Sequence, residues 1–431
     1  MSKPDFIYYY LDNLGLGLIV LITYLAFSLF ILRKQIYSIY DPGLLFLILS
    51  LSAHSVVFFL YLSEKIDYFY FYGFLATQVS FFLGWLIFKP YKPNNTGGIV
   101  NGKFSRWFYI VSVLIFIFSQ LLVYYLKGIP LLMQFRLGLF KSGDGFGLFS
   151  RLIFASSIMS YTIAVFKVLY VDQSRSSRYF DNFVIFFYLL VQVLSGSKAS
   201  ILLSGLLAFV PILYSHQFEL DRSNEKKLLK RLLFLVLVSV PFGVFTIIVQ
   251  NGLFTESSTS YLDALTTLAI RFINSGDIFY ISWVNNNIEL IRSSAYDGLL
   301  AIFSDFLGMF RLVSREELPT HLGLQVMWLL SGNFNFDGPN LRHNVFGLFY
   351  WGLYGAVLYS FILGAIFGFI RNKLIFFLPK SISGLAIFSL FFYMACYIPQ
   401  DFSSIFMSYL TSALLVLFIT ISISWIGSRI T

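Results

Sequence analysis

Residues 11–32 read LDNLGLGLIVLITYLAFSLFIL, and Asp12 is the single charged side chain among them. A helix needs about 20 predominantly apolar residues to cross the hydrocarbon layer of a bilayer, so this stretch predicts a transmembrane helix. It is too long for the apolar core of a signal peptide and has no small-residue cleavage site. We therefore expect it to remain in the membrane as an anchor.

Similar apolar runs recur along the chain of 431 residues. They lie at about 43–62, 68–88, 107–126, 148–170, 183–215, 232–250, 345–370, 382–398 and 403–426. The run 183–215 is too long for one crossing, and the polar stretch Ser195–Ser200 interrupts it, which predicts two short helices and a turn. We expect an all-α, polytopic transmembrane helix bundle of about eleven spans, within a range of ten to twelve.

The composition indicates that most of the protein surface faces lipid and not water. Hydrophobic residues make up 58% of the chain and charged residues only 12%, too few to cover the surface of a soluble domain. The formal net charge is +9, but most cations lie between apolar runs, so we expect no nucleic-acid partner. Cys396 is the only cysteine, which rules out a disulfide within the chain.

The cations between the runs predict the orientation. They stand in alternate connections: Arg33 and Lys34; Lys89, Lys92, Lys103 and Arg106; Arg175 and Arg178; Arg222, Lys226, Lys227, Lys230 and Arg231; and Arg371, Lys373 and Lys380. Short loops rich in Lys and Arg stay in the cytoplasm. We therefore expect these connections in the cytoplasm, with the N-terminus outside and the C-terminus inside.

The longest break in the apolar pattern divides the chain into three parts. We expect an N-terminal transmembrane bundle over 1–250, a large extracytoplasmic loop over 251–344 and C-terminal transmembrane helices over 345–431. Within the loop, large apolar residues recur at helical spacing and predict an amphipathic helix on the membrane surface. They are Tyr261, Leu265, Leu268, Phe272, Phe279 and Trp283. The runs 298–313 and 321–330 predict shorter interfacial helices.

The loop uses arginine as its cation. It holds five arginines and no lysine: Arg271, Arg292, Arg311, Arg315 and Arg342. A planar guanidinium matches the oxygens of a phosphate, which suits a lipid-linked diphosphate. The alternative is that these arginines pair with the loop's Asp and Glu residues at the surface. We favour function for Arg271 and Arg342.

The sharpest motif is Arg342-His343-Asn344, at the end of the loop before an apolar helix. We expect it at the outer membrane interface, where His343 could take a proton from a sugar hydroxyl and Arg342 could stabilise a departing phosphate. Asn344 could orient either one. The alternative is a helix-capping Asn with polar neighbours at the interface.

Further candidates for binding the diphosphate lie elsewhere. Arg271 is on the polar face of the expected surface helix, and Asp277 follows nearby. Lys198 interrupts an apolar stretch, where a cation marks either a functional cavity or a turn with the side chain reaching water. The chain has no Asp-x-Asp metal clamp and no Walker motif, so we expect chemistry without a metal or other cofactor.

The layout resembles bacterial O-antigen polymerases of the Wzy type. It shares their ten to twelve spans, a long outer loop late in the chain, and Arg-His-Asn before a glycine-rich helix. His343-Asn344 followed by Gly352-Leu353-Tyr354-Gly355 is also similar to O-antigen ligases, with a shorter spacer. Some polymerases carry an outer-loop arginine with a glycine eleven positions on, as Arg136 and Gly147 stand here.

The resemblance implies a glycosyltransferase with a fold like that of the GT-C membrane glycosyltransferases. Its donor and acceptor would be undecaprenyl-diphosphate-linked oligosaccharide repeat units, joined at the periplasmic face of a bacterial inner membrane to build lipopolysaccharide. The resemblance therefore implies that the loop 251–344 is periplasmic. Arg271 and Arg342 would hold diphosphate, with Arg136 as a third cation. A membrane protein that regulates chain length is a further candidate partner. The alternatives are an O-antigen ligase, a flippase for lipid-linked oligosaccharides, and a membrane scaffold without chemistry.

Overall fold

The computed structural model describes residues 1–92, 102–133, 146–197, 200–221, 223–254, 260–314, 316–331, 338–401 and 407–430. Every regular element in these ranges is a helix. The helices are α1 Lys3–Asp12, α2 Leu14–Leu32, α3 Pro42–Leu62, α4 Tyr68–Leu86, α5 Lys103–Lys127, α6 Gly147–Tyr170, α7 Arg175–Leu194, α8 Ser200–Leu207, α9 Phe209–Ser215, α10 Glu225–Phe254, α11 Tyr261–Asn274, α12 Asp277–Ser282, α13 Ala295–Met309, α14 Leu322–Ser331, α15 His343–Asn372, α16 Leu374–Phe377, α17 Ile382–Cys396 and α18 Met407–Ile430.

The expected apolar runs all contain helices. Within the described ranges, eight helices are long and apolar enough to cross a membrane, namely α2, α3, α4, α5, α6, α10, α15 and α18. The run 183–215 is divided as expected, because α7 ends at Leu194, Gly196 takes a positive φ of 63°, and α8 begins at Ser200. Helices α8, α9 and α17 are shorter apolar helices. The chain is a multi-pass membrane protein by these criteria.

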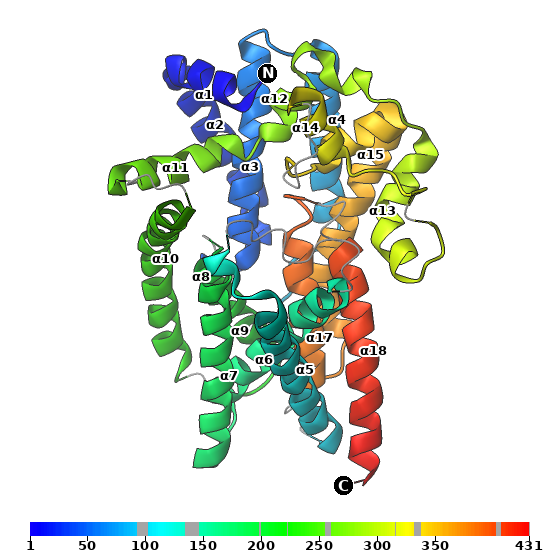
Figure 1. Ribbon diagram of the computed structural model, residues 1–431. Coiled ribbons are helices and arrows are strands. Elements are labelled where there is room, and N and C mark those ends of the chain that lie inside the picture. The colour runs from blue at the N-terminus through cyan, green and yellow to red at the C-terminus, as the bar shows by residue number, and fades with distance from the viewer. Residues whose placement is uncertain are drawn as a thin grey trace.

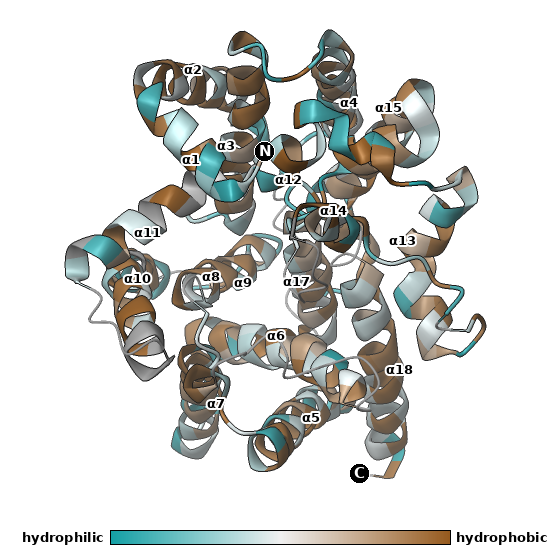
Figure 2. Ribbon diagram, turned by 45° about the horizontal axis from the view of Figure 1, so that its top comes forward, coloured by the Kyte–Doolittle hydropathy of each residue, from teal (hydrophilic) through white to brown (hydrophobic). Residues whose placement is uncertain are grey.

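The helices pack around two main hydrophobic cores, which form two groups in Figure 2. One core joins α1 to α4 with α12 and α15, and the other joins α5, α6, α7, α9 and α18 with most of α17. Ala395, near the C-terminal end of α17, and Ile398, just after the helix, belong to the first core. Helix α17 therefore links the two groups, and the polar residues described below lie near this junction.

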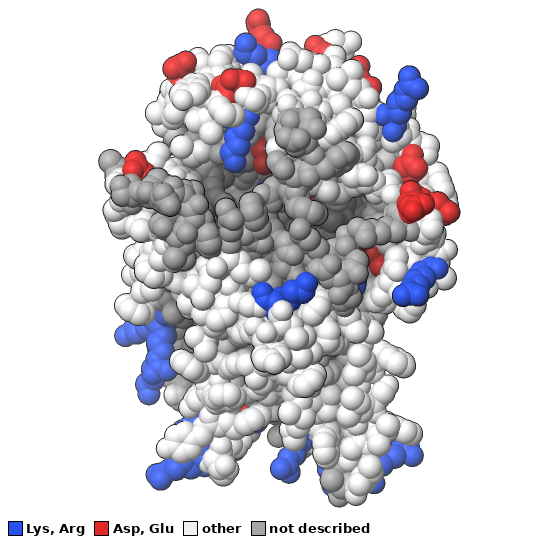
Figure 3. Space-filling model, in the orientation of Figure 1, with Lys and Arg blue, Asp and Glu red and all other residues white. Residues whose placement is uncertain are grey.

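Charges are distributed unevenly along the long axis of the bundle. In Figure 3, Asp and Glu side chains gather over the upper part of the visible face, whereas the lower end carries mostly Lys and Arg. The ends of α5 and α7 that bear Lys103, Arg106, Arg175 and Arg178 point toward this lower end in Figure 1. The distribution matches the alternation of cation-rich connections in the sequence.

Helices α4 and α15 approach each other closely through glycines. A Cβ added to Gly364 would collide with the backbone carbonyl of Phe81, and one added to Gly84 would collide with that of Phe361. Glycines at such contacts allow membrane helices to pack backbone against backbone. The close contact fixes α15 against α4, and the candidate site lies along this pair.

The amphipathic helix expected over 261–283 is shorter in the structure. Helix α11 ends at Asn274 and lies across the direction of the long helices (Figure 1). After a break at Ser275 and Gly276, the short helix α12 enters the first core, where Phe279 and Trp283 are buried. These two residues are therefore core residues, although their helical spacing suggested the membrane surface. Helices α13 and α14 form at the two shorter runs as expected.

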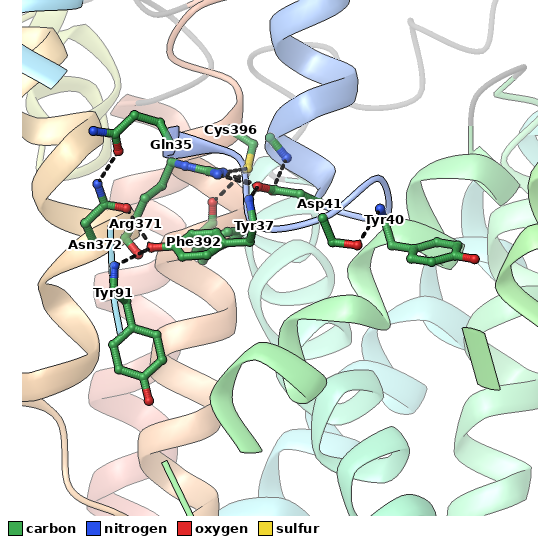
Figure 4. A network of polar contacts seen from close by, with 11 residues as sticks. Gln35, Tyr37, Tyr40, Asp41, Tyr91, Arg371, Asn372, Phe392 and Cys396 are labelled. Carbon is green, nitrogen blue, oxygen red and sulfur yellow. Dashed lines mark hydrogen bonds and ion pairs between the residues drawn. The ribbon is translucent and has the colours of Figure 1, made fainter. Parts of the chain in front are cut away.

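A buried polar network ties the connection before α3 to the end of α15 (Figure 4). Arg371 donates to both carboxylate oxygens of Asp41, at 3.2 and 2.6 Å, and both side chains are almost fully buried. Asn372 donates to Gln35 at 2.8 Å and accepts from the hydroxyl of Tyr37 at 2.7 Å. The sequence groups Arg371 with loop cations, but the structure makes it half of a buried ion pair.

Candidate functional site

Helix α15 is a hairpin of two arms rather than one continuous span. Gly352 has φ 64° and ψ −170°, a combination that essentially only glycine adopts, and the chain reverses there. The imidazole Nδ1 of His343 lies 2.9 Å from the hydroxyl of Ser360 although 17 residues separate them. A straight helix would hold these residues about 25 Å apart. The short arm 343–351 therefore runs back along the long arm 353–372.

The hairpin carries Arg342-His343-Asn344 down into the bundle. The short arm is antiparallel to α4, since Leu348 contacts Gly73 while the His343 ring stacks on Phe81, with ring centroids 4.9 Å apart. At 1.5 Å of rise per residue, His343 lies roughly 13 Å below the turn. The sequence suggested the outer membrane interface for this motif, but the structure buries all three residues. The hairpin is the physical reason for the difference.

Arg342 is held by oxygens from three separate segments. Its guanidinium donates to the carbonyl of Ser275 at 2.9 Å, the carbonyl of Pro399 at 3.1 Å and the hydroxyl of Ser50 at 3.3 Å. Ser275 stands at the break between α11 and α12, and Pro399 follows α17. Two helix ends and the middle of α3 thus meet at one guanidinium, which is fully buried. Burial of a cation inside a membrane protein costs free energy, so a buried arginine suggests a functional site.

Two carboxyl groups act on Arg342 through space. Burial raises the pKa of Asp277 to about 6, although the charge of Arg342 opposes this shift. Burial also raises the pKa of Asp401 to about 7, again against the effect of Arg342. Burial lowers the pKa of Arg342 to about 10, so the guanidinium stays charged at neutral pH. The two carboxyl groups and the guanidinium therefore form one electrostatically coupled cluster.

His343 faces a second histidine across the site. The ring of His54, on α3, lies 6.5 Å from the ring of His343, centroid to centroid, and perpendicular to it. Nε2 of His54 lies 3.4 Å from the hydroxyl of Ser50, which also contacts Arg342. In the described part of the chain, Nε2 of His343 and Nδ1 of His54 have no protein partner. These free ring nitrogens could exchange protons with a substrate.

Asn344 fixes the short arm to α4. Its amide nitrogen donates to the hydroxyl of Thr77 at 2.9 Å, and Thr77 in turn donates to the carbonyl of Gly73. The amide oxygen of Asn344 is buried without a partner among the described residues. The contact favours an orienting role for Asn344, because it holds the start of the short arm in place.

The structure places the other predicted site residues only in part. Asp277 lies near Arg342, as the electrostatic effects above require. Arg271 belongs to α11, but its side chain lies outside the described residues. Arg136 and Lys198 also lie outside the described residues. Their roles stay predictions. Within the described ranges, no group of three or more His, Cys, Asp or Glu side chains is placed to hold a metal ion.

Two cavities have walls that include residues from the segments next to this polar group. One cavity, of about 420 Å³, is bordered by Arg292, Glu289 and the short-arm residues Leu348 and Phe349. A second cavity of about 280 Å³ lies within the second helix group, among α5, α6, α7, α17 and α18, with hydroxyl and amide side chains in its wall. These polar residues are Gln120, Tyr124, Ser150, Ser157, Tyr188, Gln192, Ser195, Tyr393, Tyr397 and Tyr409. Asp401 donates its backbone N–H to the carbonyl of Tyr397, a residue of this second cavity's wall.

Sequence reasoning missed Asp401, Ser50 and His54. Asp401 stands in a polar interruption between two apolar runs, and His54 is the one ionisable residue in the run 43–62. An ionisable group inside an apolar run is a functional signal in a membrane protein, so His54 could have been found. Comparison of the chain with protein-family models, curated protein sequences and solved structures found no match.

Proposed function

We propose that this membrane protein is a glycosyltransferase that polymerises undecaprenyl-diphosphate-linked oligosaccharide repeat units at the periplasmic face of a bacterial inner membrane. The observation that supports the proposal most is the meeting of Arg342, His343 and two titratable carboxyl groups inside the bundle. These are the groups needed to stabilise a departing diphosphate and to accept a proton from a sugar hydroxyl.

The proposed reaction transfers the growing glycan to the incoming unit. A hydroxyl oxygen of the acceptor sugar attacks the anomeric carbon of the donor, and the bond from that carbon to the diphosphate oxygen breaks. The electron pair leaves with the lipid diphosphate, whose added charge Arg342 stabilises. The hydroxyl proton passes to a base. Positioning and electrostatics in a site shielded from water would supply most of the acceleration.

Asp401 joins His343 as a candidate base. Its pKa of about 7 is close to the operating pH, which is where a general base works best. One of its carboxylate oxygens, Oδ1, is buried without a partner among the described residues. Because Arg342 and His343 are both shut off from solvent, the proposed reaction requires the hairpin and its neighbours to open before substrate binds.

The second candidate is a flippase for the same class of lipid. A re-entrant helix whose first residues lie deep in the bundle, beside buried ionisable groups, is typical of transporter binding sites. In that function Asp277 and Asp401 would couple transport to protons instead of activating a hydroxyl. An O-antigen ligase would use the same chemistry as the polymerase with a different acceptor.

The test replaces Arg342, His343 or Asp401 and examines the surface polysaccharide by gel electrophoresis. We expect Arg342→Lys, His343→Ala and Asp401→Asn to leave single repeat units on the lipid A-core and to remove long chains. Arg106→Ala is the matched control, because Arg106 is an exposed cation remote from the site. Protein levels in the membrane are compared by immunoblot, so that loss of folding is recognised.

The outcomes separate the candidates. Loss of all surface sugar, including single units, would favour a flippase or ligase over a polymerase. Normal chain lengths in all three variants at normal protein levels would remove these residues from the mechanism. A purified protein that extends a synthetic lipid-linked repeat unit, and stops doing so with Asp401→Asn, would support the polymerase directly.

A further inference from the structure

A groove lies between α6, α7 and α10 and reaches Ala208, just before α9. The first turns of α7 and α10 lie toward the cation-rich end of the bundle (Figure 1). The volume of the groove is about 490 Å³. The polar part of the wall consists of Arg178, Asn182, Asn224, Lys227 and Arg231. Arg178 stands near the start of α7, and Lys227 and Arg231 stand one turn apart near the start of α10. None of the residues in the groove wall belongs to the site described above.

The three cations of this groove have no acidic partner among the described residues. The acids nearest in sequence are engaged elsewhere. Asp181 is buried against Lys167 at 2.9 Å and accepts a hydrogen bond from Tyr109. Glu225 accepts a hydrogen bond from Tyr170 at 2.7 Å. Three neighbouring positive charges without internal compensation would attract an anion.

The remaining wall of the groove is apolar. It consists of Val165, Val168, Leu169, Ile185, Leu189, Ala208, Leu228 and Leu232, together with the ring of Tyr161. A soluble anion such as phosphate would make no contact with this apolar surface, whereas a lipid would pack its acyl chain against it. Guanidinium and ammonium groups beside such a wall match the headgroup and the chain of one molecule.

From this geometry we propose that the groove binds an anionic phospholipid of the surrounding leaflet. The phosphate would lie against Arg178, Lys227 and Arg231, with Asn182 and Asn224 as further hydrogen-bond donors. An acyl chain would run along Val168 and Leu189. The occupant is a lipid from the cation-rich side of the membrane, and the proposal is independent of the function proposed for the site around Arg342.

The experiment measures lipid retention on the purified full-length protein by native mass spectrometry. The probes are dioleoyl phosphatidylglycerol, which is anionic, and dioleoyl phosphatidylcholine, which is zwitterionic and has the same chains. We expect the protein to retain the anionic lipid selectively. Lys227→Gln/Arg231→Gln should weaken its binding by about fivefold for each cation removed, or roughly 25-fold in total.

The matched control is Lys226→Gln/Lys230→Gln, which removes two cations from the same helix that do not line the groove. It should leave binding within about twofold of the unchanged protein, on the scale of distant surface charges. Val168→Trp keeps every charge but fills the apolar wall, so it should also displace the lipid. Elution as a single peak in size-exclusion chromatography checks that each variant is folded.

Three results would overturn the proposal. The first is equal weakening by the two double variants, which would mean general surface attraction. The second is unchanged binding in Lys227→Gln/Arg231→Gln. The third is displacement of the lipid by millimolar inorganic phosphate together with normal binding in Val168→Trp, which would make the site one for a free anion.

Discussion

The ion pair between Asp41 and Arg371 should be among the most sensitive points of the fold. Asp41→Asn removes the negative charge but keeps an oxygen that can accept from the backbone N–H of Gly43, as Asp41 does at 2.8 Å when it caps α3. Arg371, which is 1% exposed, would then be a buried cation without its partner. Removal of one partner from a buried pair costs about 3–5 kcal/mol, so we expect a loss of that size in the free energy of unfolding.

A double-mutant cycle isolates the interaction. Arg371→Met alone should cost a similar amount, since it leaves the carboxyl of Asp41 buried. The double variant should lose clearly less free energy of unfolding than the two single variants together, because no uncompensated charge remains. Asp305→Asn is the control: its partner Arg151 lies at 3.4 Å and both groups are partly exposed, so a loss of at most about 1 kcal/mol is expected.

The assay is equilibrium unfolding in mixed detergent micelles, followed by tryptophan fluorescence. A stability of Asp41→Asn equal to that of the unchanged protein would refute the reasoning. So would strict additivity in the double variant, since it would mean that the two groups do not interact energetically.

Three further predictions concern pH and glycine. Because burial raises the pKa of Asp401 to about 7, the folded state binds more protons than the unfolded state between about pH 4 and 7. Stability should therefore fall as pH rises through this window, and Asp401→Asn should flatten the dependence in thermal unfolding. Gly352→Ala should lower the free energy of unfolding by about 1–3 kcal/mol, because alanine is strained at the positive φ of this position. Gly15→Ala should not lower it measurably in the same assay, because a Cβ at Gly15 would contact nothing. Gly364→Val should cost about 1–3 kcal/mol by collision with Phe81, read from denaturant midpoints; an unchanged midpoint would contradict the close contact.

The helices could be predicted from sequence because each needs a local excess of apolar residues. The runs that predict spans contain the helices of the structure, and Ser195–Ser200 marks the break between α7 and α8. The length of a run, however, does not reveal the path of the chain within it. The run 345–370 predicts one span, and the reversal at Gly352 depends on a backbone conformation that a glycine permits but does not dictate.

The partners of buried charges could not be predicted, because they are set by tertiary packing. Asp41 and Arg371 are 330 residues apart in the chain, and nothing local to either one points to the other. The same holds for Arg342 and Asp401. Asp277 follows Arg271 by six positions in the sequence, but α11 ends at Asn274 and Asp277 begins α12, where its charge acts on Arg342.

The length of the hairpin's short arm determines the position of the site. The nine residues of this arm, counted from the reversal at Gly352, set how far His343 reaches and which way its ring faces. One inserted residue would lower the motif by about 1.5 Å and rotate it by about 100°. The ring would then lose both Ser360 and the face of Phe81, while helix content and hydrophobicity would hardly change. Insertions in this arm are therefore a means to disable the site without removing any of its side chains.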